Sequence, residues 1–337
     1  NNTAVGYTAL YLNTTGTSNT AIGKEALKAN TTASNNTAVG YFALAVNTTG
    51  QHNTAVGESS LTSTTTGSYN TALGLNAGKL NTTGTQNTYL GREAGNSGTT
   101  SSYNTIVGHT AGYALTTGNY NTALGNSSLR YNTTGAENAA FGYDALYSNT
   151  TANNNAAFGR LALYANTTGE LNTGLGATAL DANTTGSSNT AVGAEALGKN
   201  TTASYNTAVG RRALFENTTG QYNTAVGRQA MQSNTTADRN VAVGYISMYS
   251  NTTGQYNTAV GMNSLNASTT GSDNTSIGYN AGNNITTGGH NTMLGRNTAA
   301  EDGGAEYQIA IGYGVKCLSD NSIYIGRDTG SNRIWNN

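Results

Sequence analysis

Proline is absent from the 337 residues, only one cysteine occurs, and charged side chains make up 9% of the chain. Ordinary globular domains carry roughly 25% charged residues. The single thiol, Cys317, has no second cysteine to pair with, which is compatible with an extracellular protein. The sequence has no run of about 18 apolar residues that could span a membrane. The net charge of −1 provides no electrostatic basis for binding nucleic acid.

What the chain has in abundance is glycine, asparagine and threonine, arranged in a repeat. The pentapeptide at residues 2–6, Asn-Thr-Ala-Val-Gly, returns every 17 residues. Its glycine recurs from Gly6 to Gly312, which is 18 intervals of 17 residues without an insertion or deletion. Loops normally tolerate changes in length. A period this strict indicates that every residue of the repeat belongs to a stacked coil.

The length of the repeat indicates the fold class. It reads Asn-Thr-Ala-Val-Gly-x-x-Ala-Leu-x-x-Asn-Thr-Thr-Gly-x-x. Helical repeats need about 33 to 47 residues because they hold two or three helices. We therefore predict an all-β protein, a β-solenoid with one 17-residue coil per repeat. The pattern predicts a short strand at residues 3–5, a second around Ala9 and Leu10, and a turn at residues 13–16.

Two columns of large apolar residues are the predicted core. Alternation along a strand places Thr3 and Val5 on one face and Ala4 on the other. We expect the valine position to face inward, because it is always bulky and apolar; its members run through Val5, Ile22, Val39, Val56, Leu73, Leu90, Val107, Leu124, Phe141, Phe158, Leu175 and Val192 to Leu294 and Ile311. The second column is Leu10, Leu27, Leu44, Leu61, Leu129, Leu146, Leu163, Leu180, Leu197, Leu214, Met231, Met248 and Leu265.

Four coils have glycine in place of the core leucine: Gly78, Gly95, Gly112 and Gly282. In three of them a large residue just downstream, Leu80, Leu115 or Ile285, is expected to fill the space. No such residue follows Gly95, so loose packing is predicted there.

An asparagine opens 18 successive repeats up to Asn291, beginning with Asn2, Asn19, Asn36 and Asn53. Stacked identical amides can hydrogen-bond from coil to coil. We predict a structural ladder; the alternative is an outward row that faces a ligand or ice.

The core of each coil is small for a thin solenoid that stands alone, because only about two large side chains per coil offset the entropy of ordering the backbone. Rows of alanine, which include Ala4, Ala21 and Ala38, would let a second chain approach closely. A homo-oligomer is therefore expected, and threefold symmetry suits a fibre of parallel identical chains.

The end of the sequence carries a resemblance. Residues 308–312, Gln-Ile-Ala-Ile-Gly, are followed by residues 321–326, Asn-Ser-Ile-Tyr-Ile-Gly, with a glycine spacing of 14. This resembles the 14-residue head repeat of trimeric autotransporter adhesins, in which an Ala-Ile-Gly strand recurs around a left-handed parallel β-roll. The 17-residue repeats look like that unit with three residues added in the Asn-Thr-Thr turn. Similar Asn-Thr-Ala-Val-Gly arrays occur in bacteriophage tail fibres and related surface proteins. The resemblance implies a homotrimeric extracellular fibre.

No pattern for catalysis, a cofactor or a metal is found. The three histidines, His52, His109 and His290, are spread widely along the chain, so neither a metal site nor a catalytic triad is expected. Carboxylates such as Glu195 alternate with arginines such as Arg211 after the glycines, which is typical of a solvated edge. Phosphate-loop and calcium-repeat motifs are absent. The chain is therefore predicted not to be an enzyme and to need no cofactor.

Candidate contact residues lie at the variable positions of the repeat. Tyrosines recur just before the opening asparagine, and those in adjacent coils should stack about 4.8 Å apart. The candidate surface contacts are Tyr103, Tyr120, Tyr205, Tyr222, Tyr256, Arg211 and Arg212. The alternative is that the tyrosines only brace turns. The Asn-Thr-Thr turns match the pattern of glycosylation acceptors, which the repeat itself also explains.

Three regions are expected: residues 1–312 as 17-residue coils, 313–330 as a final 14-residue coil, and 331–337 as a tail that leads to a further domain. The leading functional hypothesis is an extracellular adhesive fibre, a surface-adhesin head or phage tail fibre, whose partners are itself as a homotrimer and a cell-surface glycan or protein receptor. No contact with nucleic acid and no membrane insertion are expected. The alternatives are an inert spacer or filament, and an ice-binding solenoid.

Overall fold

The computed structural model describes residues 1–327 and 332–334. The chain divides into two compact units, an N-terminal unit of Asn1–Leu171 and a C-terminal unit that begins at Asn172. The described residues contain strands and turns but no helix. The chain is thus an all-β parallel β-solenoid of about 19 coils with 17-residue spacing, as the repeat predicts.

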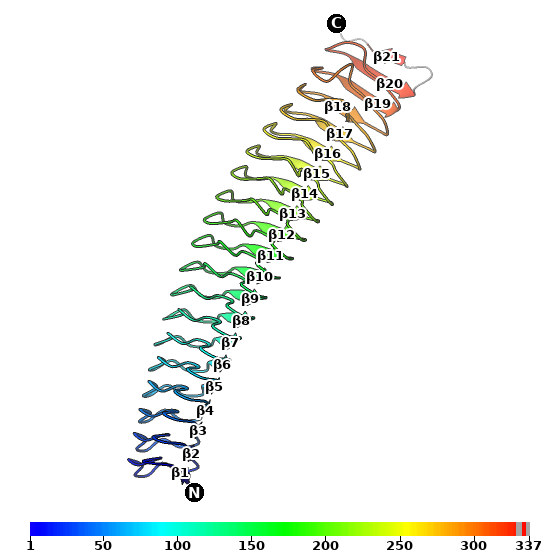
Figure 1. The fold of residues 1–337 in the computed structure, drawn as a ribbon. Helices are drawn as coiled ribbons and strands as arrows, with labels where there is room; N and C mark the ends of the chain where they lie inside the picture. Colours follow the sequence, from blue (N-terminus) through cyan, green and yellow to red (C-terminus); the bar gives the residue numbers. More distant parts are fainter. Residues whose placement is uncertain (328–331, 335–337) are drawn as a thin grey trace. The chain divides into compact units, whose positions relative to one another are not determined.

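The N-terminal unit contains one three-residue strand per coil, stacked side by side (Figure 1). Each strand pairs in parallel with the one a repeat later, so that Ala38 lies opposite Ala55 and Val39 opposite Val56. The strands are β1 (Thr3–Val5), β2 (Thr20–Ile22), β3 (Thr37–Val39), β4 (Thr54–Val56), β5 (Thr71–Leu73), β6 (Thr88–Leu90), β7 (Thr105–Val107), β8 (Thr122–Leu124), β9 (Ala139–Phe141) and β10 (Ala156–Phe158).

The C-terminal unit continues the pattern and then shortens it. Its strands are β11 (Thr173–Leu175), β12 (Thr190–Val192), β13 (Thr207–Val209), β14 (Thr224–Val226), β15 (Val241–Val243), β16 (Thr258–Val260), β17 (Thr275–Ile277), β18 (Thr292–Leu294), β19 (Ile309–Tyr313), β20 (Ile323–Arg327) and β21 (Asn332–Ile334). All neighbouring pairs from β11 to β20 are parallel, whereas β21 pairs antiparallel with β20. Part of the predicted tail is therefore a strand, and residues 328–331 and 335–337 lie outside the described residues.

The final coil is shorter by a part of the turn. Ile309 pairs with Ile323, which is the 14-residue spacing seen in the sequence. Cys317 donates its backbone N–H to Ala299, and Asn321 donates to Glu306. In the last coil only three residues separate Cys317 from Asn321. The corresponding segment of the previous coil, which follows Ala300, contains more residues. The omitted residues thus fall in the region of the Asn-Thr-Thr turn.

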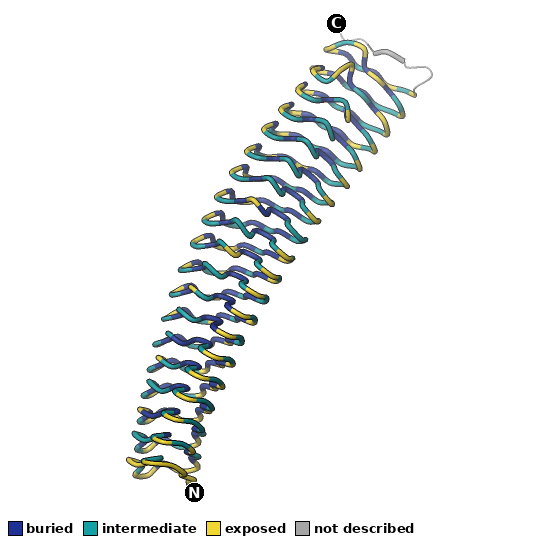
Figure 2. Tube along the Cα trace, in the orientation of Figure 1, coloured by how far each residue is buried: buried dark blue, intermediate teal, exposed yellow. Residues whose placement is uncertain are grey.

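The core lies on the opposite face of the strand from the predicted one. The strand alanines, such as Ala38 and Ala208, are fully buried, whereas the flanking threonines and valines face outward. The expectation of an interior valine column was therefore wrong, while the leucine column from Leu27 onward is buried as predicted. Figure 2 shows buried segments alternating with exposed edges along each coil. Because the coil is thin, its interior has room for only one large apolar side chain, the leucine, beside small alanines and the buried asparagines.

Large residues at the strand alanine position fill the space that glycine leaves at the core leucine position. Tyr89 replaces a strand alanine, and its buried ring lies where side chains on Gly78 and Gly95 would otherwise be. Ile106 fills the space at Gly112 in the same way. The coil at Gly95 is therefore well packed, contrary to the expectation from its sequence.

Two of the three proposed downstream replacements are buried. Leu115 and Ile285 are almost fully buried, but they occupy the position that holds asparagine in most turns. Leu80 is 41% exposed, so the expectation that it fills the core at Gly78 was wrong.

The segment opposite the strand consists of turns rather than the predicted second strand. Most coils hold three non-glycine residues with positive φ, for example Glu195, Leu197 and Tyr205 at φ of 60°, 50° and 63°. The repeat glycine has φ of +138° at Gly40, and a Cβ there would lie 2.5 Å from the Gly57 carbonyl oxygen. Glycine is required at this position because both the φ angle and the close approach of the next coil exclude a side chain.

Candidate functional surfaces

Two buried asparagine columns hold successive coils together. In the opening column, the Asn36 side chain donates Nδ2–H to the Gly50 carbonyl at 2.9 Å and accepts the Asn53 backbone N–H at 2.9 Å. Asn19 makes the same contacts, and Asn2 accepts the Asn19 backbone N–H at 2.9 Å. These amides face inward from Asn19 onward and form a structural ladder, so they present no ligand-binding row.

The second column is the asparagine of each Asn-Thr-Thr turn. Asn47 donates Nδ2–H to the Asn30 side-chain oxygen at 3.0 Å and to the Gly50 carbonyl at 2.9 Å. A sugar linked to this nitrogen would have to replace buried hydrogen bonds. The buried turn asparagines are therefore not available as glycosylation sites in the folded coil.

The outer face, which we define as the threonine and valine positions of the strands, is a regular surface that repeats in each coil. Its apolar column is exposed at many positions, for example 46% at Leu124 and 47% at Leu175. The threonines beside it are exposed or half-buried in every coil where they occur. This face therefore presents a continuous stripe of apolar and β-branched side chains within each unit.

The tyrosine column, the residues just before the opening asparagines, lies on an exposed edge of the coils. Tyr103 and Tyr120 stack with ring centroids 4.9 Å apart, and Tyr205 and Tyr222 at 5.0 Å, as predicted. The Arg239 guanidinium carbon lies 5.6 Å from the Tyr256 ring centroid. The five candidate tyrosines are 46–58% exposed. Because stacked rings partly cover each other's faces, the column presents mainly ring edges and hydroxyl groups.

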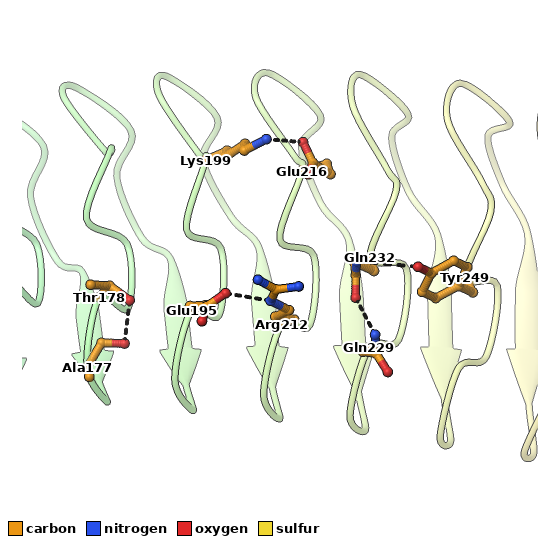
Figure 3. Close-up of polar contacts among 9 residues, drawn as sticks. All are labelled: Ala177, Thr178, Glu195, Lys199, Arg212, Glu216, Gln229, Gln232 and Tyr249. Atoms are coloured by element: carbon orange, nitrogen blue, oxygen red, sulfur yellow. Dashed lines mark hydrogen bonds and ion pairs between the residues drawn. The ribbon is translucent and has the colours of Figure 1, made fainter.

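The two candidate arginines differ in their surroundings. Arg211 is exposed. Arg212 is half-buried and donates Nε–H to the Glu195 carboxylate one coil earlier (Figure 3). Its guanidinium carbon lies 4.9 Å from the Phe215 ring centroid. Lys199 and Glu216 form a second ion pair between coils at 2.6 Å (Figure 3). Surface ion pairs of this kind contribute about 1 kcal/mol or less each.

Sequence reasoning missed a second aromatic group, the tyrosine cluster of Tyr113, Arg130, Tyr131, Tyr147 and Tyr164. All five lie in the segment opposite the strand, in four successive coils of the N-terminal unit. Tyr147 and Tyr164 stack at 5.1 Å, whereas Tyr131 and Tyr147 meet edge to face at 5.0 Å. The signal was available, because aromatic residues and one arginine occupy the position after the core leucine in consecutive repeats.

The remaining features are sparse. A shallow apolar cavity of about 400 Å³ lies near the N-terminal end, lined by Leu12, Glu25, Lys28, Ala29, Phe42, Ala45, Val46 and Thr62. Among the described residues no group of three potential metal ligands occurs, and no helix long and apolar enough to cross a membrane. Cys317 is buried, and that burial raises the pKa of its thiol to about 11.

Comparison with known proteins gives no relative on which a function could rest. No protein-family model matches the chain, and no curated protein sequence matches it. The class of protein is therefore defined by the fold, a parallel β-solenoid with an exposed apolar face.

Proposed function

We propose that this chain is the repeat segment of an extracellular fibre, the head or shaft of a surface adhesin or a phage tail fibre. In this proposal three parallel copies of a left-handed β-roll pack through their outer faces, and the assembled fibre binds cell-surface glycans or proteins multivalently. The observation that carries the proposal is the exposed apolar stripe along the strands of each unit.

An apolar stripe of this length is unusual on a protein that works as a monomer. Soluble monomers rarely expose contiguous apolar patches larger than a few hundred Å². The stripe here repeats at the same strand position in coil after coil, with members such as Leu73, Leu90 and Leu124 more than 40% exposed. A second and third copy of the same face, in the same register, would bury it coil by coil.

On the outer face, a larger side chain at the apolar position goes with a smaller side chain at the threonine position of the same coil. In β9 and β10 the apolar position enlarges to Phe141 and Phe158, and the threonine position shrinks to Ala139 and Ala156. Side chains that faced only water would have no reason to exchange volume in this way. Compensation within one coil is expected if identical coils at the same height pack against each other, which supports a parallel, in-register homo-oligomer.

The alanine rows do not provide this interface, as the sequence had suggested, because the strand alanines are buried within their own coils. The outer face replaces them as the proposed site of assembly.

Assembly is tested by charges placed on alternate coils of the outer face, so that new carboxylates do not face each other across a rung. We expect the parent chain to have three times its monomer mass of 34.5 kDa in light scattering. The variant Val192→Asp, Val226→Asp, Val260→Asp should become monomeric and keep its β-sheet circular dichroism. The matched control carries aspartate at Thr202, Thr236 and Thr270, which are exposed in the turns of the same coils.

Two results would refute the proposed interface. One is a parent chain that is monomeric at all concentrations, and the other is an outer-face variant that assembles as well as the control. Ala208→Asp serves as the unfolding control in the same assays, because Ala208 faces the core.

Adhesion is proposed to lie at the variable edges, since the ladders and the core are uniform. Tyr205 and Tyr222 are 54% and 50% exposed, and Arg211, in the same repeat as Tyr222, is also exposed. Weak contacts at such positions add up along a multivalent fibre. We expect Tyr205→Ala with Tyr222→Ala to lower binding to cells while the melting temperature changes by only a few degrees. Unchanged binding would instead favour an inert spacer or self-assembling filament.

Ice binding is a second candidate because of one observation. The strand threonines face outward, contrary to the inward direction expected from the sequence, and form a regular row on a parallel sheet. This function requires the outer face to be free, whereas the fibre buries it. Thermal hysteresis in the parent protein, lost in the outer-face variant, would support ice binding over assembly.

A further inference from the structure

A regular column of exposed side chains in the C-terminal unit is formed by the residues that follow the repeat glycine. We call it the after-glycine column, and in six successive coils it consists of Arg228, Tyr245, Met262, Tyr279, Arg296 and Tyr313. All six residues are exposed, and the three tyrosines are 40–45% exposed. Arginine or methionine alternates with tyrosine, so this column repeats every two coils rather than every coil.

The positive charge of the column is not balanced by carboxylates beside it. In these six coils neither the residue before the glycine nor the second residue after it is acidic. Among the residues that the structure describes, no ion pair involves Arg228 or Arg296. The carboxylates Asp238 and Asp273 lie just before the strands, at the opposite end from the column. The two guanidinium groups are therefore free to bind an anion from solution.

Tyrosine rings hold these arginines in place. The Arg296 guanidinium carbon lies 5.6 Å from the ring centroids of both Tyr279 and Tyr313, one coil to either side. The Arg228 guanidinium carbon lies over the Tyr245 ring, also 5.6 Å from its centroid. A guanidinium group that stacks on a ring still presents the N–H bonds at its edge, which can bind a carboxylate or sulfate through two hydrogen bonds. Because the side chain is already held, binding costs less conformational entropy.

The period of the column matches that of a simple acidic polysaccharide. One coil rises about 4.8 Å, so two coils span about 9.6 Å. A pyranose unit in an extended polysaccharide is about as long as one coil rise, and a disaccharide is about as long as two. A polysaccharide that lies along the stack would therefore place every second sugar at Arg228, Met262 and Arg296. The sugars between them would lie at the tyrosines.

We propose that the after-glycine column from Arg228 to Tyr313 binds a linear acidic polysaccharide with one carboxylate or sulfate group per disaccharide. Arg228 and Arg296 each bind an anionic group, and Met262 contacts the sugar midway between them. The tyrosine hydroxyl groups hydrogen-bond to the alternate sugars. The inference deepens the proposed adhesive function and rests on it for the surface that carries the glycan. The column belongs to a single chain, so binding does not require the trimer.

A nucleic acid matches the column less well. Phosphate groups follow one another along a nucleic acid strand more closely than one per two coils, and binding to them depends on many cations. The column offers two arginines in six coils, and the net charge of the whole chain is −1. A sparse row of cations with aromatic rings between them is better suited to a polymer of low charge density.

The experiment measures binding of the full chain to hyaluronan, which carries one carboxylate per disaccharide, by biolayer interferometry. The matched neutral polymer is carboxyl-reduced hyaluronan. We expect the chain to bind hyaluronan, more weakly as salt is added, and to bind the reduced polymer about tenfold more weakly or less. Arg228→Gln with Arg296→Gln should weaken binding by about tenfold or more, because two charge-assisted contacts are lost. The matched control, Lys199→Gln with Lys316→Gln, removes the same charge at exposed positions outside the column and should bind like the parent.

A gain of binding tests the two-coil period directly. Met262→Arg places a third cation midway between Arg228 and Arg296, where the next anionic group of the polysaccharide would lie. We expect it to tighten binding to hyaluronan by about threefold or more. Thr236→Arg adds the same charge in an exposed turn and should leave binding unchanged. Equal gains in the two variants would show that only net charge matters and would overturn the proposal.

Other results would also overturn it. They are a parent chain that does not bind hyaluronan, equal binding to the carboxyl-reduced polymer, equal losses in the two double variants, and binding to poly(dT) as tight as to hyaluronan at the same salt concentration. Loss of hyaluronan binding in Tyr205→Ala with Tyr222→Ala, but not in the arginine variant, would place the site in the tyrosine column instead. A parent chain that binds cells but not hyaluronan would refute this ligand and leave the adhesive function standing. Binding to hyaluronan through the column by a monomeric chain would support the inference and refute only the trimer.

Discussion

Replacing Asn206 by leucine should destabilise the chain more than the same replacement at Asn217, although both side chains are fully buried. Asn206 belongs to the opening column. Its side-chain oxygen accepts the Asn223 backbone N–H at 2.9 Å, and its Nδ2 donates to the Gly220 carbonyl at 2.9 Å. Leucine would leave the buried N–H of Asn223 without an acceptor.

Asn217 belongs to the turn column, where leucine does less harm. The Gly220 carbonyl that accepts from Asn217 would still accept from Asn206, so no backbone group loses its only partner. Asn234 would keep its hydrogen bond to Ala237. The chain already has Leu115 and Ile285 at this position, and asparagine oxygens without a partner are tolerated elsewhere in the column: Asn47, Asn81 and Asn251.

The magnitude follows from the unpaired backbone group. An unsatisfied buried donor costs about 1–3 kcal/mol, so Asn206→Leu should lower the free energy of unfolding by about 2 kcal/mol more than Asn217→Leu. Coil-resolved hydrogen exchange is the appropriate assay, because a stack of repeats can open by segments. Equal effects of the two substitutions, or a larger effect at Asn217, would refute the distinction between the two columns.

Three further substitutions probe the backbone and the edge. Gly40→Ala should destabilise its coil by about 3 kcal/mol or more, because of the strained φ, and Gly50→Ala less, since Gly50 has no positive φ and other coils carry alanine there; urea unfolding measures both. Ser188→Gly should raise the free energy of unfolding by up to about 1 kcal/mol, because Ser188 has φ of 59°. Glu195→Gln should break the pair with Arg212 and cost about 1 kcal/mol or less, and a larger loss at high salt would contradict this.

The sequence by itself determined the coil length, the all-β class, the parallel in-register pairing and the shortened last coil. These follow from the period, because a repeat of constant length stacks like residues on like residues. The spacing of Tyr205 and Tyr222 could be predicted for the same reason. The opening asparagines could also be placed in a ladder, since stacked identical amides satisfy one another.

The side of the strand that faces inward was decided only by the tertiary structure. Alternation shows that Ala208 and Val209 point in opposite directions, but it does not say which of them faces the core. The opposite segment decides this, because its leucine fills the thin interior and leaves room only for alanine. One coil provided an indication in the sequence, because it has the large Tyr89 at the alanine position and Gly95 at the leucine position. This combination can be interpreted only when both positions are known to face the same interior.

The contact between Tyr131 and Tyr147 also depended on the tertiary structure. The two residues occupy different repeat positions, 16 residues apart, so the period does not bring them together. They meet because the turn segment opposite the strand contains left-handed residues, such as Leu129 and Leu146, which set the direction of the side chains that follow. A repeat predicts which residues stack, whereas contacts between columns depend on backbone angles that the period does not specify.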